Sequence, residues 1–299
     1  MGLLRPNPLS SWTIRQALTW AGSCLQAEGI PDPRLSAELL LGSVLGLDRL
    51  GLIIHSDQSL DEKEGLFFQE KVLRRVRHEP IAYLTGHKEF WSLNFEVNPD
   101  VLIPRPETEM LVEETLSIVS TQTGPMTLVE LGTGSGAISI AMSKSLKHLS
   151  TTRLIATDLS REALRTAQKN AALHGMEKNI HFVQGDWLGP FSSHSRWIDL
   201  LVSNPPYISE LEMFSLPETV KGYEPVQALS GGLDGLESLR QIFHQAATQL
   251  KTGGWLLLEI GETQGPPILT LAQQHHFNPI TILRDHAGKD RVLKACYHG

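Results

Sequence analysis

Cysteine is scarce in this sequence of 299 residues, which contains only Cys24 and Cys296. Two cysteines so far apart, with no partners at metal-ligand spacing, indicate neither a disulfide framework nor a zinc site. Long apolar runs are missing too, because stretches such as residues 255–258 fall far short of the ~20 residues needed to cross a bilayer. We therefore expect two ordinary thiols, no bound metal and no transmembrane segment.

A secretory leader and an excess of positive charge are also absent. The first thirty residues contain no sustained apolar stretch and no small-residue cleavage site, so we expect the protein to stay in the cytoplasm. The net charge of −7 argues against nucleic acid as the main partner, since phosphate binding depends on clustered lysine and arginine. One basic cluster lies in a predicted helix, and we interpret it as a solvated helix face: Lys71, Arg74, Arg75 and Arg77.

The chain is long enough for two domains, one of about 200 residues and a smaller one. In its N-terminal part, apolar residues recur at helical spacing over residues 11–28, with Ser10 or Ser11 as the N-cap and Gly29 as the stop. Two more helices are predicted over residues 33–45 and 61–78. Residues 1–84 are therefore predicted to form a small helical domain.

A β-hairpin is predicted to link the two domains within residues 85–106. Residues 90–97 alternate apolar and polar side chains, and the turn-forming residues 98–100 lead into the apolar residues 101–103. Residues 107–120 then have helical spacing, with acidic residues in the first turn. This helix begins the second domain, residues 107–299.

Strands and helices alternate through the second domain. We predict strands over residues 127–131, 153–158, 180–184, 198–203 and 255–260, with two short strands near 281–284 and 291–295. Helices are predicted over residues 137–146, 161–174, 235–250 and 263–275. This alternation specifies an α/β fold with a mainly parallel sheet and helices on both faces. The long segment 204–234 lacks clear periodicity, and we interpret it as the wall or lid of an active site.

A glycine-rich turn joins the first predicted strand to its helix and consists of Gly132, Thr133, Gly134, Ser135 and Gly136. Doubly wound folds bind ligands at this position, and glycine lets the backbone approach a ligand closely. The spacing is G-x-G-x-G and not the G-x-G-x-x-G of dinucleotide enzymes. A sulfonium amino acid attached to a ribose therefore fits better than a pyrophosphate, and the alternative is a tight turn without a ligand.

Acidic and aromatic residues follow the next two strands. Asp158 is suited to accept hydrogen bonds from two ribose hydroxyls, and its alternative role is the N-cap of the helix that begins near Ser160. Asp186 is suited to accept from an adenine amino group and Trp187 to stack on the ring, although core packing would also explain this tryptophan. Together with the glycine-rich turn, these residues outline an adenosine pocket.

The tetrapeptide Asn204-Pro205-Pro206-Tyr207 follows the apolar strand over residues 198–203. Its two prolines hold the backbone rigid and leave a carbonyl free to face a ligand. An amide nitrogen is a poor nucleophile because its lone pair is delocalised. If the Asn204 side-chain oxygen and the Pro205 carbonyl each accept one N–H of a substrate NH2 group, the lone pair is directed at a sulfonium methyl group. Tyr207 would pack on the flat substrate group. The pattern predicts methylation of nitrogen, and the alternative is a rigid turn.

With these motifs the sequence resembles the HemK/PrmC family of protein-(glutamine-N5) methyltransferases. The resemblance extends to residues 103–109, Ile-Pro-Arg-Pro-Glu-Thr-Glu, and to residues 223–225, 228–229 and 231–236. It implies a class I, Rossmann-like methyltransferase domain with a seven-stranded sheet. It also implies S-adenosyl-L-methionine as the methyl donor, with S-adenosyl-L-homocysteine as the product.

The resemblance further implies the substrate and the roles of the site residues. The substrate would be the glutamine of the Gly-Gly-Gln motif in class 1 peptide chain release factors, methylated on its side-chain nitrogen. The N-terminal domain would help to hold the release factor. The cofactor contacts would be residues 132–136, Asp158, Trp187 and Asn204, and residues 204–207 would hold the glutamine. We expect a monomer that binds neither a membrane nor nucleic acid directly.

Three other interpretations remain open. The nearest is the sister enzyme that methylates a glutamine of a large-subunit ribosomal protein, although residues 103–109 and 223–236 favour the release-factor enzyme. A DNA or RNA amino-methyltransferase is another, because Asn-Pro-Pro-Tyr suits a flipped adenine equally well, but the acidic balance argues against it. The third is a binding protein without turnover, and the intact tetrapeptide argues against that.

Overall fold

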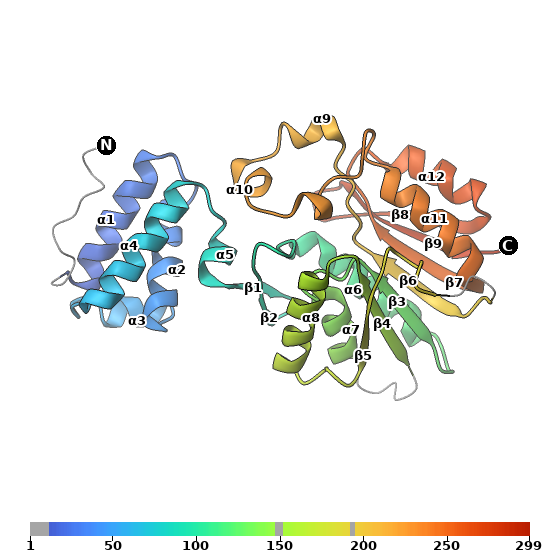
Figure 1. The fold of residues 1–299 in the computed structure, drawn as a ribbon, viewed down its shortest axis with the longest axis horizontal. Helices are drawn as coiled ribbons and strands as arrows, with labels where there is room; N and C mark the ends of the chain where they lie inside the picture. The colour runs from blue at the N-terminus through green and yellow to red at the C-terminus, as the bar shows by residue number, and fades with distance from the viewer. Residues whose placement is uncertain (1–11, 147–151, 192–194) are drawn as a thin grey trace. The chain divides into compact units, whose positions relative to one another are not determined.

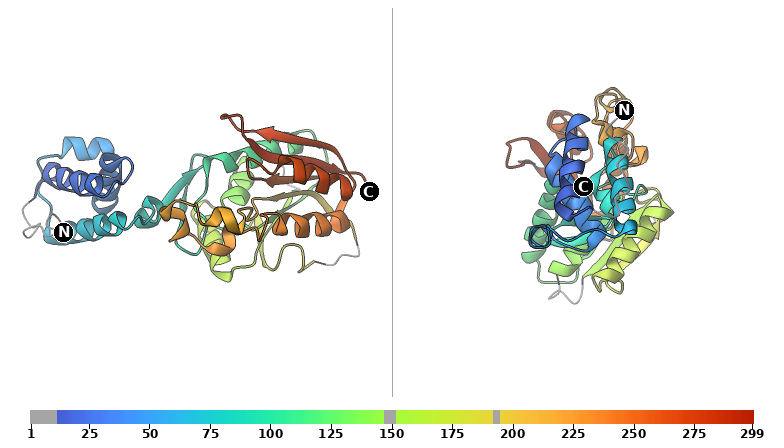
Figure 2. Two further views of the ribbon diagram at one scale, coloured as in Figure 1. Left: turned by 90° about the horizontal axis from the view of Figure 1, so that it is seen from above. Right: turned by 90° about the vertical axis from the view of Figure 1, so that its left-hand side faces the viewer.

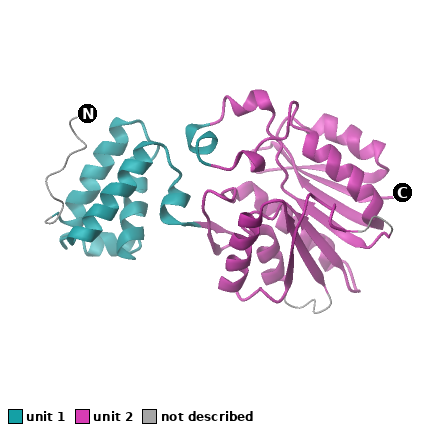
Figure 3. Ribbon diagram, viewed as in Figure 1, with its two compact units in different colours: residues 1–87, 217–223 teal, residues 88–216, 224–299 magenta. Residues whose placement is uncertain are grey.

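The computed structural model of the protein describes residues 12–146, 152–191 and 195–299, and the chain folds into two compact units. The helical unit comprises Met1–His87 with Pro217–Tyr223, and the sheet unit comprises Lys88–Leu216 with Glu224–Gly299. Figure 3 colours the two units separately. Because Pro217–Tyr223 belongs to the helical unit, the boundary between the units is not a single point in the sequence.

Within its described residues, the N-terminal part of the helical unit contains five helices (Figure 1): α1 (Ile14–Ala27), α2 (Pro33–Leu45), α3 (Arg49–Ile54), α4 (Glu62–Val76) and α5 (Ile81–Thr85). Their apolar faces meet in a core that includes Leu25, Leu40 and Phe68. The three predicted helices, α1, α2 and α4, are confirmed. The sequence gave no sign of α3 and α5, because helices of six and five residues are too short to show periodicity.

Helix α1 begins after Thr13. The Thr13 hydroxyl accepts from the Gln16 backbone N–H at 3.3 Å, and the Gln16 side chain accepts from the Thr13 backbone N–H at 2.9 Å. This capping box satisfies two N–H groups that the helix leaves free. The predicted N-cap at Ser10 or Ser11 is therefore wrong, and both serines lie outside the described residues.

The basic cluster on α4 holds the turn that follows the helix. Arg75 is 7% exposed, and its Nη1 donates to the Glu79 carbonyl at 2.9 Å. The Arg74 guanidinium donates from Nε to the Glu79 carboxylate at 2.8 Å, and the Lys71 ammonium donates to the Leu84 carbonyl. The interpretation as a solvated face is wrong for Arg75, because its guanidinium is buried by the turn that it stabilises.

A β-hairpin opens the sheet unit and consists of β1 (His87–Phe90) and β2 (Leu93–Glu96). Its turn lies at Trp91 and Ser92, whose φ angles of 53° and 56° suit the two-residue turns that connect hairpin strands. A hairpin thus lies within the predicted residues 85–106, but the turn predicted at residues 98–100 is wrong. Residues 101–103 form no strand, and the backbone N–H of Ile103 donates instead to the Glu224 carboxylate at 3.1 Å.

The described part of the sheet unit contains a seven-stranded sheet in the order β5-β4-β3-β6-β7-β9-β8. Neighbouring strands run parallel from β5 to β7, whereas β9 is antiparallel to both β7 and β8. The strands are β3 (Thr127–Leu131), β4 (Arg153–Asp158), β5 (Ile180–Gln184), β6 (Ile198–Ser203), β7 (Leu250–Glu259), β8 (Phe277–Arg284) and β9 (Asp290–Tyr297). The predicted α/β fold with a mainly parallel sheet is confirmed.

Helices cover both faces of this sheet, and they can be followed in Figures 1 and 2. On one face lie α6 (Glu109–Ser120), α7 (Ala137–Ser145) and α8 (Arg161–Leu173), and on the other α11 (Glu237–Gln249) and α12 (Gly265–Gln274). Side chains alternate along each strand, so that Leu128 and Val202 pack under the first group while Val129 and Leu201 pack under the second. Burial on both faces explains why the parallel strands are mainly apolar.

The long segment after β6 is a folded loop. It contains α9 (Glu210–Met213), α10 (Glu218–Lys221) and a 3-10 turn, η2 (Val226–Ala228). Where the segment closes, the Gly231 backbone N–H donates to the Ile208 carbonyl at 2.8 Å. Across the residues that the structure describes, no helix is long and apolar enough to span a membrane.

Candidate active site

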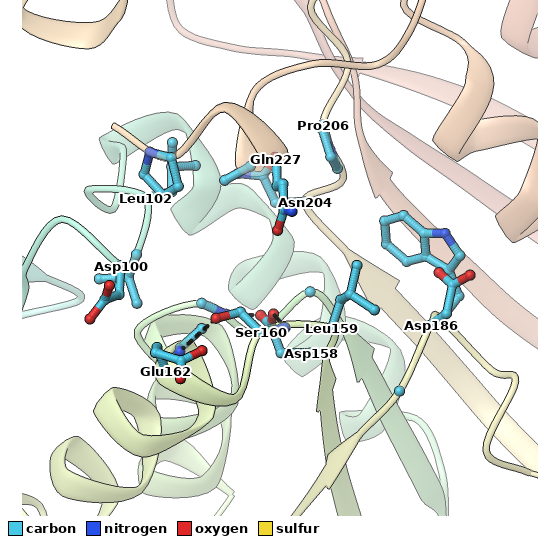
Figure 4. Close-up of a pocket in the computed structure, with 18 of the residues that line it drawn as sticks. Asp100, Leu102, Asp158, Leu159, Ser160, Glu162, Asp186, Asn204, Pro206 and Gln227 are labelled. Atoms are coloured by element: carbon cyan, nitrogen blue, oxygen red, sulfur yellow. Dashed lines mark hydrogen bonds between the residues drawn. The ribbon is translucent and has the colours of Figure 1, made fainter. Parts of the chain in front are cut away.

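A cavity of about 330 Å³ lies where the carboxyl ends of β3, β4, β5 and β6 meet, the edge at which doubly wound sheets bind ligands. Its walls also include Asp100, Leu102 and Ser160, which were not predicted, and Gln227 from the segment 204–234 that was interpreted as a wall or lid. Figure 4 shows Asp158 and Ser160 on one side, with Asn204 and Gln227 opposite them. The structure brings seven predicted site residues into this wall: Gly132, Gly134, Asp158, Asp186, Trp187, Asn204 and Pro206.

The glycine-rich turn takes a conformation that requires glycine. Gly132, Gly134 and Gly136 have φ angles of 70°, 56° and 83°. A Cβ on Gly136 would lie 2.9 Å from Ile140 Cδ1 and 3.2 Å from Ala167 Cα, so no side chain fits there. The backbone at Gly132 and Gly134 is thereby exposed to the cavity, while Gly136 lets α7 pack closely on α8.

The turn rests on Glu130, a buried carboxyl group in β3. Its Oε2 accepts from Thr133 Oγ1 at 2.7 Å and from the Ser139 hydroxyl, and its Oε1 has no hydrogen-bond partner within the described residues. Burial raises the pKa of Glu130 to about 7, although both hydroxyls oppose the rise. Thr133 and Ser135 are themselves buried, and together with Gly136 they stay outside the cavity wall. These three residues shape the turn from behind.

Asp158 joins the glycine-rich turn to the start of α8. Its Oδ2 accepts from the Gly134 backbone N–H at 2.8 Å, and its Oδ1 accepts from the Ser160 backbone N–H at 2.8 Å. Burial raises the pKa of Asp158, and these N–H groups oppose the rise. The N-cap of α8 is Ser160, whose hydroxyl accepts from the Ala163 backbone N–H at 3.1 Å. The alternative role of Asp158 as that N-cap is therefore wrong.

Trp187 lines the cavity and also packs against the core. Its indole Nε1 donates to Gln241 Oε1 on α11 at 3.0 Å, which fixes the ring. The ring lies close to Gly132 and contacts the apolar cluster beneath α11. Trp187 therefore packs in the core and also lines the cavity, and its stacking on an adenine ring stays a prediction.

Two residues of the tetrapeptide line the cavity and two do not. Asn204 and Pro206 line the cavity, while Pro205 is buried and Tyr207 half-buried behind them. The Asn204 Nδ2 atom donates to Thr108 Oγ1 at 3.2 Å, and the Tyr207 hydroxyl donates to the Glu259 carboxylate at 3.2 Å. Burial and the neighbouring Glu259 charge raise the pKa of Tyr207, so the phenol keeps its proton.

Buried polar residues that the sequence did not single out hold this site together. Thr108 Oγ1 donates to Glu259 Oε2 at 2.6 Å. Glu224 accepts from the Ile103 backbone N–H at 3.1 Å and from the Arg105 guanidinium. Glu259 could have been found from the sequence, because it is a charged residue that directly follows the apolar residues 255–258 of β7. No local pattern could connect it with Thr108, which lies 151 positions earlier.

Comparison with known proteins adds family relationships to this geometry. Residues 16–86 match the family model of the PrmC N-terminal domain, and residues 123–279 match a model of a methyltransferase domain. The release factor glutamine methyltransferase of Nitratidesulfovibrio vulgaris is 39% identical over 294 residues, which is 98% of each chain. That of Coxiella burnetii is 42% identical over 88% of this chain and 91% of its own.

Solved structures show a likeness in fold. The hMettl16 catalytic domain, in a complex with a MAT2A 3′UTR hairpin, matches with a TM-score of 0.55 at 16% identity. The match covers 79% of this chain and 82% of that one.

Proposed function

Because this chain belongs to the family of release factor glutamine methyltransferases, we propose that it methylates the side-chain nitrogen (N5) of the Gly-Gly-Gln glutamine in class 1 peptide chain release factors. The chain is an S-adenosyl-L-methionine-dependent methyltransferase. In the reaction, the bond from sulfur to the methyl carbon breaks and its electron pair stays on sulfur. The amide nitrogen forms the new bond to carbon and releases one proton, which leaves S-adenosyl-L-homocysteine and N5-methylglutamine.

A single cavity that contains both halves of the predicted site carries this proposal. Its volume of about 330 Å³ is in the range of small-molecule sites. The backbone at Gly132 and Gly134, the Asp158 carboxylate and the Asp186-Trp187 pair would hold the cofactor on one side. The tetrapeptide borders the same cavity, so a glutamine held there would meet the methyl group directly.

Asn204 and Pro205 would act on the glutamine amide itself. The Asn204 side-chain oxygen and the Pro205 carbonyl each accept one N–H, which turns the nitrogen lone pair toward the sulfonium carbon. Positive charge develops on this nitrogen as the bond forms, and the same two oxygens stabilise it. Tyr207 is held by Glu259 and would close one side of the glutamine site.

The helical unit is the part that we propose to hold the release factor. It exposes large apolar side chains on α3 and α4, namely Leu50, Ile53, Ile54, Leu66 and Phe67, which are 57–67% exposed. Large apolar side chains exposed to solvent are a feature of protein-binding surfaces. Because release factors act on ribosomes, the cytoplasm is the proposed location.

Transfer of labelled methyl groups from S-adenosyl-L-methionine tests the proposal. A class 1 release factor should be labelled, and changing its Gly-Gly-Gln glutamine to alanine should abolish the label. Label that persists on the alanine variant, or that appears only on ribosomal protein or nucleic acid, would refute the assignment and identify the competing acceptor.

The variant Asn204→Ala tests the chemistry proposed for the tetrapeptide. We expect the affinity for S-adenosyl-L-methionine to stay within about tenfold while turnover is nearly lost, since the side chain acts mainly in the transition state. The matched control is Asn179→Ala, an exposed asparagine that precedes the amino end of β5. Equal turnover in the two variants would contradict the role of Asn204.

A further inference from the structure

A chain of hydrogen bonds links Asn204 to a buried carboxylate on another strand. Asn204 Nδ2 donates to Thr108 Oγ1 at 3.2 Å, and Thr108 Oγ1 donates to Glu259 Oε2 at 2.6 Å. Thr108 is 4% exposed and Glu259 is 1% exposed, so water does not compete for these bonds. Thr108 ends η1 (Pro106–Thr108), Asn204 directly follows β6, and Glu259 ends β7.

The positions of the protons in this chain determine which way the Asn204 amide faces. An ionised carboxylate only accepts, so the single hydroxyl proton of Thr108 points to Glu259 and its lone pairs face Asn204. Of the two ends of an asparagine amide, only the NH2 group donates to such a lone pair. The oxygen of Asn204 is therefore turned away from Thr108, and Figure 4 shows it facing the interior of the cavity.

The surroundings of Glu259 act on its ionisation in both directions, and burial is the largest effect. Burial raises the pKa of Glu259, and the Thr108 hydroxyl, the Arg291 guanidinium and the Tyr207 hydroxyl oppose that rise, whereas Glu107 adds to it as a like charge. Each oxygen of the carboxylate faces a hydroxyl donor, Tyr207 at Oε1 and Thr108 at Oε2, and this geometry suits a group that only accepts.

Glu259 also holds the other end of the tetrapeptide. Its Oε1 accepts from the Tyr207 hydroxyl at 3.2 Å, while its Oε2 accepts from Thr108. A rotation of this carboxylate would therefore disturb both Asn204 and Tyr207. The backbone of the segment is fixed separately, because Gln264 Nε2 donates to the Tyr207 carbonyl at 3.0 Å.

We propose that Thr108 and Glu259 are positioning residues for methyl transfer, which fix the Asn204 amide with its oxygen toward the glutamine and hold Tyr207 beside it. The inference deepens the proposed function and rests on it. Without these two residues the Asn204 amide is free to turn by half a rotation. It would then present NH2 to one N–H of the glutamine amide, where two donors meet, and only the Pro205 carbonyl would remain as an acceptor.

Thr108→Val removes the hydroxyl while keeping the shape of the side chain. We expect kcat for release-factor methylation to fall about 10- to 100-fold, because a misplaced group near the reacting atoms costs about that much. The dissociation constant for S-adenosyl-L-methionine should change less than threefold. Thr108→Ser restores the hydroxyl and should recover most of the turnover. The matched control is Thr115→Val on α6, since Thr115 is equally buried but its hydroxyl has no partner in the described structure.

The variant Glu259→Gln distinguishes a role in positioning Asn204 from a role in the stability of the fold. The glutamine NH2 group competes as a donor toward Thr108, whose own proton then turns to Asn204 and reverses the amide. We expect kcat to fall about 10- to 100-fold. The melting temperature should stay equal or rise, because the variant removes a buried charge without changing volume. A role in folding alone would instead lower activity and melting temperature together.

The outcomes distinguish this inference from the proposed function. If the wild-type protein methylates no release factor, the proposed function fails. If the wild type is active and folded Thr108→Val and Glu259→Gln both keep kcat within twofold, the positioning role is wrong. It is also wrong if cofactor affinity falls as much as kcat in both. Should Thr108→Val fail to fold, Glu259→Gln alone decides.

Discussion

Arg105 and Glu224 form an ion pair between the segment before α6 and the long loop after β6. Removing this ion pair by mutation tests how much it contributes to the free energy of unfolding. The Glu224 side chain is 1% exposed and has two donors, the Arg105 guanidinium and the Ile103 backbone N–H at 3.1 Å. Arg105→Met keeps most of the aliphatic stem and removes the charge. The buried carboxylate is then left with a single neutral donor.

The size of the effect follows from the burial of the two partners. Removing one partner of a buried ion pair costs about 3–5 kcal/mol. Because the Arg105 side chain is 35% exposed, water screens part of the attraction, and we expect about 2–3 kcal/mol. For a unit of this size that corresponds to a fall in melting temperature of about 5–10 °C. The double variant Arg105→Met/Glu224→Gln no longer buries a lone charge and should recover at least about 1 kcal/mol.

Urea denaturation followed by circular dichroism measures these differences, and hydrogen exchange at the Ile103 amide reports the local effect. The control is Arg240→Met, because Arg240 and its partner Asp234 are each 49% exposed and should contribute under about 0.5 kcal/mol. The reasoning is refuted if Arg105→Met costs no more than Arg240→Met. It is equally refuted if the double variant is less stable than the single one.

Two further predictions concern the cofactor side of the cavity. Because burial raises the pKa of Glu130 from 4.5 to about 7, the folded protein holds this proton more tightly, and stability is lost as pH rises from 4.5 through about 7. Relative to Glu130→Gln, the wild type should lose about 2–3 kcal/mol between pH 5 and pH 8, and a difference independent of pH in denaturation experiments would contradict this. Trp187→Ala should weaken binding of S-adenosyl-L-methionine about 10- to 100-fold in calorimetry, the worth of an aromatic ring stacked on a base. If the affinity does not change, Trp187 does not stack on the adenine ring and its role is core packing alone.

The strands of the sheet were predictable from local sequence. β3, β4, β5 and β6 begin and end at the predicted residues, because each is an apolar run bounded by turn residues and buried between helices. The glycine-rich turn and the tetrapeptide were equally visible, since both lie directly after such strands. The family and the methyl donor that these motifs imply are confirmed.

What the sequence did not reveal depends on backbone conformation and on distant contacts. The turn at Trp91 and Ser92 has positive φ angles without glycine or asparagine, so the usual hairpin signal is missing. The hydrogen bonds of Thr108 and Glu259 join residues that only the complete sheet brings together. Local patterns therefore located the cavity wall but not the residues behind it.

The chain passes between its two units three times, after His87, after Leu216 and after Tyr223. A fragment that starts at residue 88 would therefore keep residues 217–223 but lose the helices with which they pack. One of the lost bonds is that from the Tyr223 hydroxyl to the Arg77 carbonyl, at 2.6 Å. Synthesis proceeds from the N-terminus, so the helical unit is complete only after residue 223 has left the ribosome. Residues 88–216 of the sheet unit have been synthesised by then.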